Sequence, residues 1–388
     1  MRKINKKVLQ KKKIAILIFI VILAIFMIVL FSLYLSQKNV RDWIDINILR
    51  KTLAESDAET ISLNTDKTNQ IHVYNDFISI LSDKSLSIYN SFGENLTSID
   101  VNINSCIFDS SEKYLVIAEN KGNEICLILD KTYLWSATTD SEILQVHVNK
   151  NGYVAVVSTD ITHKSVVILY NPEGKKLFTS YFSSTRIVDA SISDDNKYIA
   201  IGELNLSGAV IQSNVKILSI ENAQKKPENT IINTFNIDSD SLITNVEYQQ
   251  GGQIACIYDN KAIVINNESQ KEIINYQNGN ILYVSNELRN NIVYVEEKSE
   301  GIFDVSSSIH IVNTLNNQEK LYKLEDIVKQ IYTKGNVIAL NTGTEIYFIN
   351  TSGWLIKKYS SNQEITNVKI SDGLAVVIYK DKIEIIKL

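Results

Sequence analysis

The stretch DASISDDNKYIAIG, residues 189–202, decides the fold. Two short runs rich in apolar residues flank a polar turn, in which Asp and Asn favour a tight reversal of the chain. This pattern predicts two antiparallel strands joined by a hairpin. The same pattern returns as SCIFDSSEKYLVIA at 105–118 and as NVKISDGLAVVIY at 367–379. The hairpin is therefore the unit of a repeat.

The second strand of this hairpin recurs along most of the chain. Its copies are spaced by about 40 residues, which is the period of a four-stranded propeller blade. The copies are FISIL at 77–81, YLVIA at 114–118, YVAVV at 153–157, YIAIG at 198–202, QIACIY at 253–258, NIVYV at 291–295, NVIAL at 336–340 and LAVVIY at 374–379. We therefore predict an all-β propeller of eight blades, with seven as the alternative if the weak first unit is misread.

A second hairpin follows each copy, as in SVVILYNPEGKKLFTS at 165–180, where Asn and Gly suit a tight turn. The last repeat has only three clear strands, at 366–370, 374–379 and 383–388. An open ring would expose sheet edges and an apolar blade face. We therefore expect ISLN at 61–64 to supply the missing strand, so that both ends of the domain close the ring.

A hydrophobic segment precedes the repeats. Residues 14–35 read IAILIFIVILAIFMIVLFSLYL without a charge, and a helix of this length spans about 33 Å, enough for a bilayer core of about 30 Å. The alternative is a cleaved signal peptide, which has a shorter apolar core and a small-x-small cleavage site. The end of this segment and the residues after it, SLYLSQKNV at 32–40, contain no such site. This favours a retained single-pass anchor, a signal-anchor in contact with the lipid bilayer.

The charges that flank this segment predict its orientation. The tip at 1–13 carries seven cations and no acid, and the net charge of −5 leaves about −12 for the remaining chain. The positive-inside rule places this basic tip in the cytoplasm and the C-terminal domain outside the cell membrane. The acidic domain would repel phosphate backbones, so we expect no nucleic-acid partner.

The segment at 36–58 joins the anchor to the propeller predicted at 59–388. Apolar residues at 40–54 recur on one helical side, which indicates a short helix at the membrane surface or an ordinary connecting helix. Tyr34 and Trp43 are candidate membrane-interface residues, because amphipathic rings favour the headgroup level.

No residue pattern indicates catalysis, a cofactor or a metal. The four histidines are separated in sequence, and no G-x-S-x-G, H-E-x-x-H or P-loop motif occurs. Asp194-Asp195 and Asp238-x-Asp240 could bind calcium, but the first pair lies in a hairpin turn and the second lacks an EF-hand spacing. We expect the three cysteines, Cys106, Cys126 and Cys256, to be buried free thiols. We therefore expect no catalytic residue, no cofactor site and no metal site, and a protein that is not an enzyme.

Two segments resemble the blade signature of quinoprotein-like propellers: LILDKTYLWSA at 127–137 and GWLIKKY at 353–359. In that signature the Trp packs between blades. The chain as a whole resembles uncharacterised single-pass membrane proteins of Gram-positive (clostridia-like) bacteria with an extracytoplasmic quinoprotein/WD40-like β-propeller. The resemblance rests on VRDWIDINILRK at 40–51, YNDFISILSDKSLSIYNSFGENL at 74–96 and the repeats above, and it implies fold and location only.

Two functions remain open at this point. The first is a scaffold or protein-interaction module at the cell envelope, with an unknown envelope or secreted protein as partner, because propellers carry variable loops on a rigid ring. The alternative is binding or enzymatic processing of a small ligand or glycan in the central channel, where Asp189, Ser191 and Asn245 are candidate channel-facing residues. Sensing through the short cytoplasmic tip is a third, weaker option.

Overall fold

The computed structural model describes residues 2–36, 44, 58–226, 230–236, 241–267, 269–276, 280–299 and 305–388. Its first element is the helix α1 (Arg2–Ser36). The window Leu17–Leu35 has a mean hydropathy of 3.1 and none of it is buried, so by length and composition this helix could cross a membrane or serve as a signal sequence. Most of the predicted juxtamembrane segment, with Trp43, lies outside the described residues.

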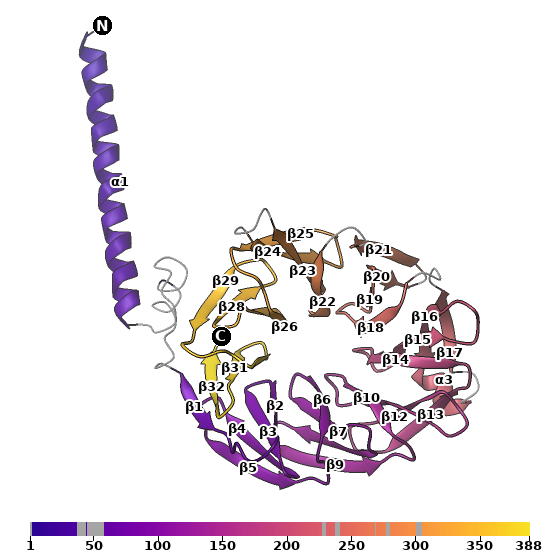
Figure 1. Cartoon of the computed structure of the whole chain (residues 1–388). Helices are drawn as coiled ribbons and strands as arrows, with labels where there is room; N and C mark the ends of the chain where they lie inside the picture. The colour runs from indigo at the N-terminus through magenta and orange to yellow at the C-terminus, as the bar shows by residue number, and fades with distance from the viewer. Residues whose placement is uncertain are drawn as a thin grey trace.

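The described strands form eight antiparallel sheets of four strands, which stand around a central axis as the blades of a propeller (Figure 1). The prediction of eight blades is confirmed. Blades 1 to 4 are β2 (Asn69–Tyr74), β3 (Phe77–Ser82), β4 (Ser85–Asn90) and β5 (Asn95–Asp100); β6 (Cys106–Ser111), β7 (Tyr114–Glu119), β8 (Glu124–Leu129) and β9 (Thr132–Thr138); β10 (Ile143–Val148), β11 (Val154–Ser158), β12 (Ser165–Tyr170) and β13 (Lys176–Phe182); β14 (Thr185–Ile192), β15 (Tyr198–Asn205), β16 (Gln212–Ser219) and β17 (Ile231–Asn236).

The second half of the ring repeats this order, with the first strand of each blade at the channel. Blades 5 to 8 are β18 (Ile243–Tyr248), β19 (Ile254–Tyr258), β20 (Lys261–Asn266) and β21 (Ser269–Asn275); β22 (Ile281–Leu288), β23 (Asn291–Ser299), β24 (Val305–Asn313) and β25 (Glu319–Leu324); β26 (Gln330–Lys334), β27 (Val337–Asn341), β28 (Glu345–Asn350) and β29 (Leu355–Ser360); β30 (Asn367–Ile370), β31 (Leu374–Ile378), β32 (Lys382–Lys387) and β1 (Glu59–Ser62).

The core lies between neighbouring blades. The second and third strands of blade 3 are buried at every position, which explains their continuous apolar runs in the sequence. Val116 and Leu127 of blade 2 pack with Val146 and Val156 of blade 3 in one such layer. Each blade thus covers the apolar side of the next, and the layer repeats around the ring.

The strand β1 closes this ring. It pairs antiparallel with β32, with Glu59 opposite Ile385 and Ser62 opposite Lys382. The sequence predicted a closing strand at 61–64, and the structure places it two residues earlier. The Ser371 hydroxyl of blade 8 also donates a hydrogen bond to the Asn75 carbonyl of blade 1 at 2.6 Å. Residues from both ends of the domain therefore form the last blade.

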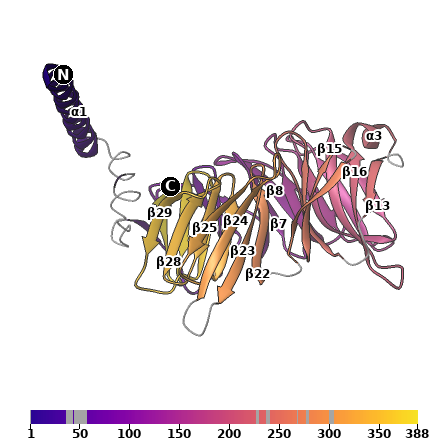
Figure 2. The same cartoon turned by 90° about the horizontal axis from the view of Figure 1, so that it is seen from above.

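The ring has two faces, seen edge-on in Figure 2. One carries the turns between first and second strands and between third and fourth strands. We call it the tether-side face, because β1 begins there and the tether, residues 37–58, connects β1 to α1. The helix α3 (Ile220–Lys225) lies on this face, between β16 and β17. The opposite face carries the remaining connections, and we call it the far face.

The two tryptophans of the blade signature have different environments. Trp135 is buried against Tyr170 of the next blade, with ring centroids 5.5 Å apart, and its indole N–H donates to the Pro172 carbonyl at 3.0 Å. Trp354 is 70 % exposed. The prediction that the signature Trp packs between blades is confirmed for Trp135 and wrong for Trp354, which lies in a turn before its strand begins.

Candidate functional site

Polar side chains lie on the innermost strands of several blades. Asp189 on β14 accepts hydrogen bonds from the Asn245 side-chain amide at 2.6 Å and from the Val246 N–H at 2.9 Å. Ser191 accepts from the Tyr248 N–H at 3.0 Å. The structure therefore places Asp189, Ser191 and Asn245 together on two adjacent inner strands, where they link blade 4 to blade 5.

A charged pair connects opposite parts of the ring. The Lys334 ammonium of blade 7 lies 3.9 Å from an Asp109 carboxylate oxygen of blade 2. Asp109 also accepts from the Val148 N–H at 2.7 Å and lies 3.3 Å from Nδ1 of His147. Because blades 8 and 1 lie between blades 7 and 2, the Lys334 side chain extends across the centre of the ring.

The pKa values of this cluster show how its charges balance. Burial raises the pKa of Asp189 to about 7 and raises the pKa of Glu247 well above its usual range. Burial lowers the pKa of His72 to about 3 and also lowers the pKa of His147. For Lys334, burial would lower the pKa, but nearby carboxylates, Asp109 first, outweigh burial and raise it. The lowered pKa values leave both histidines without a charge near neutral pH, whereas the raised pKa values of Asp189 and Glu247 favour their protonated forms and so reduce the negative charge around Lys334.

These channel groups mainly satisfy one another. No group of three or more His, Cys, Asp or Glu side chains in the described part of the chain has an arrangement that could hold a metal ion. Asp195, which the sequence offered as a calcium candidate, accepts a hydrogen bond from the Ser193 hydroxyl at 2.7 Å. Asp194 lies 2.8 Å from the Lys150 ammonium. Asp238 and Asp240 lie outside the described residues.

The three cysteines are free thiols, as predicted, although Cys106 is only partly buried. Burial raises the pKa of Cys106 and of Cys126 to about 12, and raises the pKa of Cys256 as well. A thiol with a raised pKa is a poor nucleophile near neutral pH. These cysteines therefore act as packing residues.

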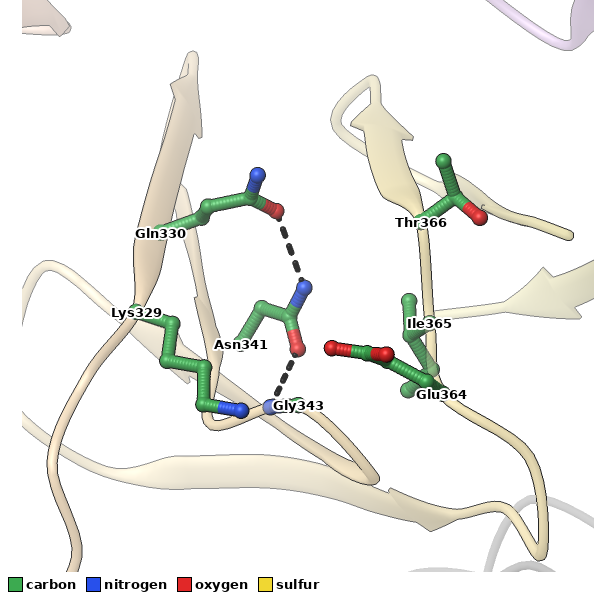
Figure 3. Close-up of a pocket in the computed structure, with 7 residues that line it drawn as sticks. All are labelled: Lys329, Gln330, Asn341, Gly343, Glu364, Ile365 and Thr366. Carbon is green, nitrogen blue, oxygen red and sulfur yellow. Dashed lines mark hydrogen bonds between the residues drawn. The ribbon is translucent and has the colours of Figure 1, made fainter.

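The far face carries a pocket of about 380 Å³ between blades 7 and 8 (Figure 3). The buried Asn341 forms its floor: its amide donates to the Gln330 side chain at 3.0 Å, and its oxygen accepts from the Gly343 N–H at 2.8 Å. Lys329 and Glu364 extend toward this floor from opposite sides. A second hollow of about 490 Å³ adjoins it and shares Lys329. Strand periodicity did not predict this pocket, because loops of two blades build it.

The far face also exposes apolar side chains over blades 3 and 4. Three connections meet there: the Ser207 hydroxyl and the Lys164 ammonium both donate to the Ser184 carbonyl, at 3.3 and 3.1 Å. The rings of His163 and Tyr181 lie 4.7 Å apart. The exposed apolar side chains on and beside these connections, which we call the far-face patch, are Ile161, Tyr181, Leu206, Val210, Ile211 and Leu242.

Of the two candidate interface residues, only Tyr34 is described. It lies in the last turn of α1 and is partly buried. Trp43 lies outside the described residues.

The sequence profile of a family of unknown function, DUF5711, matches residues 50–388. The chain belongs to this family. The match covers the complete propeller of this DUF5711 protein together with a few residues before it. A search of curated proteins by sequence finds no significant match.

Solved propellers resemble the DUF5711 chain in fold. BamB from Moraxella catarrhalis is 11% identical with a TM-score of 0.50, and the similarity covers 85% of this chain and 98% of BamB. The C-terminal WD40 domain of Sif2 is 14% identical with a TM-score of 0.55, over 84% of this chain and 98% of that domain. Sqt1 from Chaetomium thermophilum is 10% identical with a TM-score of 0.52, over 82% and 95%. At these identities the likeness concerns the fold alone.

Proposed function

We propose that this DUF5711 protein is a membrane-anchored, extracytoplasmic interaction module that binds a protein partner through the far-face patch. The observation that carries the proposal is the exposure of this patch on a rigid ring. Ile161 is 97 % exposed and Val210 is 55 % exposed, although the interior of each blade is closely packed. Clustered exposed apolar side chains mark interaction sites on soluble domains.

The position of the patch fits this role. The tether enters the ring at β1 on the tether-side face, and the patch lies on the opposite face. An anchored propeller can therefore present the patch to partners that approach from outside. The adjoining polar groups, Lys164 and His163, supply the mixed rim that surrounds the apolar centre of a protein interface.

The channel alternative receives less support from the geometry. Its polar side chains converge, but Asp189, Ser191 and Asp109 already accept hydrogen bonds from neighbouring strands. Lys334 extends into the lumen toward Asp109. A ligand would have to displace these internal contacts. We therefore propose a binding role without catalysis.

Site-specific photo-crosslinking tests the patch in native membranes. A photoreactive residue replaces Ile161 in one variant of the full chain and Leu321 in the control. Leu321 is also exposed but lies on the outer strand β25. We expect a discrete adduct at Ile161 and none at Leu321. Absence of an Ile161 adduct, or equal adducts at both positions, would contradict the proposal.

A charge substitution then tests how much the patch contributes to the binding of the partner. The double variant I161D/V210D should lower recovery of the crosslinked partner by about tenfold or more, since central interface residues often contribute at least 2 kcal/mol. The control L321D should retain the partner.

Alkaline extraction and external protease treatment of intact cells check the anchor and its orientation: the chain should remain in the membrane and the propeller should be cleaved from outside.

A further inference from the structure

The tether-side rim exposes aromatic side chains on both sides of the point where the chain enters the ring. Phe92 lies in the turn between β4 and β5 of blade 1 and is 60 % exposed. Trp354 lies in the turn between β28 and β29 of blade 7 and is 70 % exposed. Blade 8, which contains β1, stands between them. Neither side chain contributes to a blade core.

Contacts between blades make this rim continuous. The Lys387 ammonium of blade 8 lies 3.4 Å from the centroid of the Phe92 ring. The Lys357 ammonium of blade 7 donates to the Lys387 carbonyl. A Cβ atom at Gly353 would lie 3.7 Å from the Cβ atom of Lys320 in blade 6. Blades 6, 7, 8 and 1 therefore present one surface around the entry of the tether.

The turn that carries Trp354 is held in one conformation. The Trp354 N–H donates to the Asn350 side-chain oxygen and the Asn350 N–H donates to the Trp354 carbonyl, both at 3.0 Å. Gly353 has a φ of +77°, which a residue with a side chain adopts only with strain. Leu315 extends the surface from the corresponding turn of blade 6 and is also exposed. The exposure of Trp354 is thus fixed by the backbone.

We infer that this surface, formed by Phe92, Trp354 and Leu315 with the flanking Lys320, Lys357 and Lys387, rests on the lipid bilayer at the headgroup level. Trp favours the membrane interface, and lysines keep their charge in water while their stems cover apolar surface. Glu59, Glu94 and Glu319 lie on or beside the same rim. Because these acids accompany the lysines, we expect the surface to bind the membrane through its aromatic and aliphatic groups rather than through charge. A membrane of neutral phosphatidylcholine should therefore be sufficient for the contact.

The tether supports the bilayer as the occupant of this surface. Residues 37–58 separate α1 from β1 and reach at most about 77 Å when fully extended. The proposed anchor therefore allows this rim to reach the bilayer, and contact with the membrane leaves the far-face patch directed outward. The inference rests on the anchor of the proposed function, but it adds the surface that orients the ring.

Fluorescence quenching in liposomes tests the inference with the full chain. Wild type and W354F are reconstituted into phosphatidylcholine with or without brominated acyl chains. The difference between the two proteins isolates Trp354, since Trp43 and Trp135 occur in both. We expect most of this difference signal to be lost in brominated lipid. An unquenched difference signal would overturn the inference, because Trp354 would then lie in water.

A matched variant tests the opposite face. In the double variant I161W/W354F, the new tryptophan lies on the far face, and the signal that it adds over W354F should be unchanged by bromine. Quenching at this position would overturn the proposed orientation. Flotation of the same liposomes separates this result from failure of the anchor: protein that does not float contradicts the proposed function, whereas floating protein with unquenched Trp354 contradicts only the inference.

Discussion

Trp135 and Trp354 both lie near the turn between the third and fourth strands, in blades 2 and 7, yet one is buried and the other exposed. Trp135 lies inside β9, opposite Leu127 in the ladder, and packs against the next blade. Trp354 precedes β29 and belongs to the turn itself. The position of the tryptophan relative to the start of its strand therefore decides whether its indole ring packs in the core or lies on the surface. Packing between blades explains the burial of Trp135, whereas the exposure of Trp354 is not explained by packing within the propeller.

The comparison separates residues that stabilise the ring from residues that are available to other molecules. The first group includes the buried Trp135 and the partly buried cluster around Lys334 and Asp189. The exposed group includes Trp354 on the tether-side face and Ile161 on the far face. Substitutions in the first group should change the free energy of unfolding, and substitutions in the second should leave it almost unchanged.

The largest expected difference is between alanine substitutions of the two tryptophans. W135A should lower the free energy of unfolding by about 3–5 kcal/mol, because it leaves a cavity between blades 2 and 3 and removes the hydrogen bond to Pro172. W354A should change it by less than about 0.5 kcal/mol. Urea unfolding followed by circular dichroism checks both. Equal losses in the two variants would show that Trp354 has a structural role.

A smaller effect is expected for K334M in the channel. The variant removes the cation that faces Asp109 and Glu247, and we expect a loss of about 1–2 kcal/mol at pH 8 for this partly exposed pair. The loss should shrink at pH 5, because Glu247 binds a proton more readily when the cation is absent. Urea unfolding at the two pH values measures this. A loss that is independent of pH would argue for packing by the lysine stem alone.

The smallest effect is expected for D189N, and it has the opposite sign. The folded-state pKa of Asp189 is raised to about 7 from 3.8, so the folded protein binds the proton more tightly than the unfolded chain. Wild-type stability therefore falls as pH rises from about 4 to about 7. Asn keeps an acceptor for the Val246 N–H without the charge, so D189N should be more stable than wild type at pH 8. The raised pKa sets an upper limit of about 4 kcal/mol on this gain. Because Asp189 is only partly buried, we expect a gain of about 1 kcal/mol in urea unfolding.

The control for D189N is its behaviour in acid. Below about pH 3 the wild-type carboxyl is protonated in both states, and the two proteins should then have equal stability. A variant that is less stable than wild type at pH 8 would show that the ionised carboxylate stabilises the two adjacent inner strands.

Much of the ring could be predicted from the repeats. Periodic apolar strands such as YVAVV at 153–157 are buried on both sides, so their pattern is continuous and easy to recognise. The closing strand at Ile61 was also predictable, since the last repeat lacked a partner. The far-face pocket was not, because Lys329 and Glu364 come from loops of different blades whose approach depends on the closed ring.

The sequence by itself determined the repeat and the apolar segment Leu17–Leu35, because each follows from local periodicity and hydrophobicity. It favoured eight blades but left seven open, and the structure shows eight. Only the tertiary structure decided which side chains meet. It brought Lys334 within 3.9 Å of Asp109 and surrounded the entry of the tether with Phe92 and Trp354. The physical reason is ring closure: residues from distant repeats become neighbours only when the eighth blade joins the two ends of the domain.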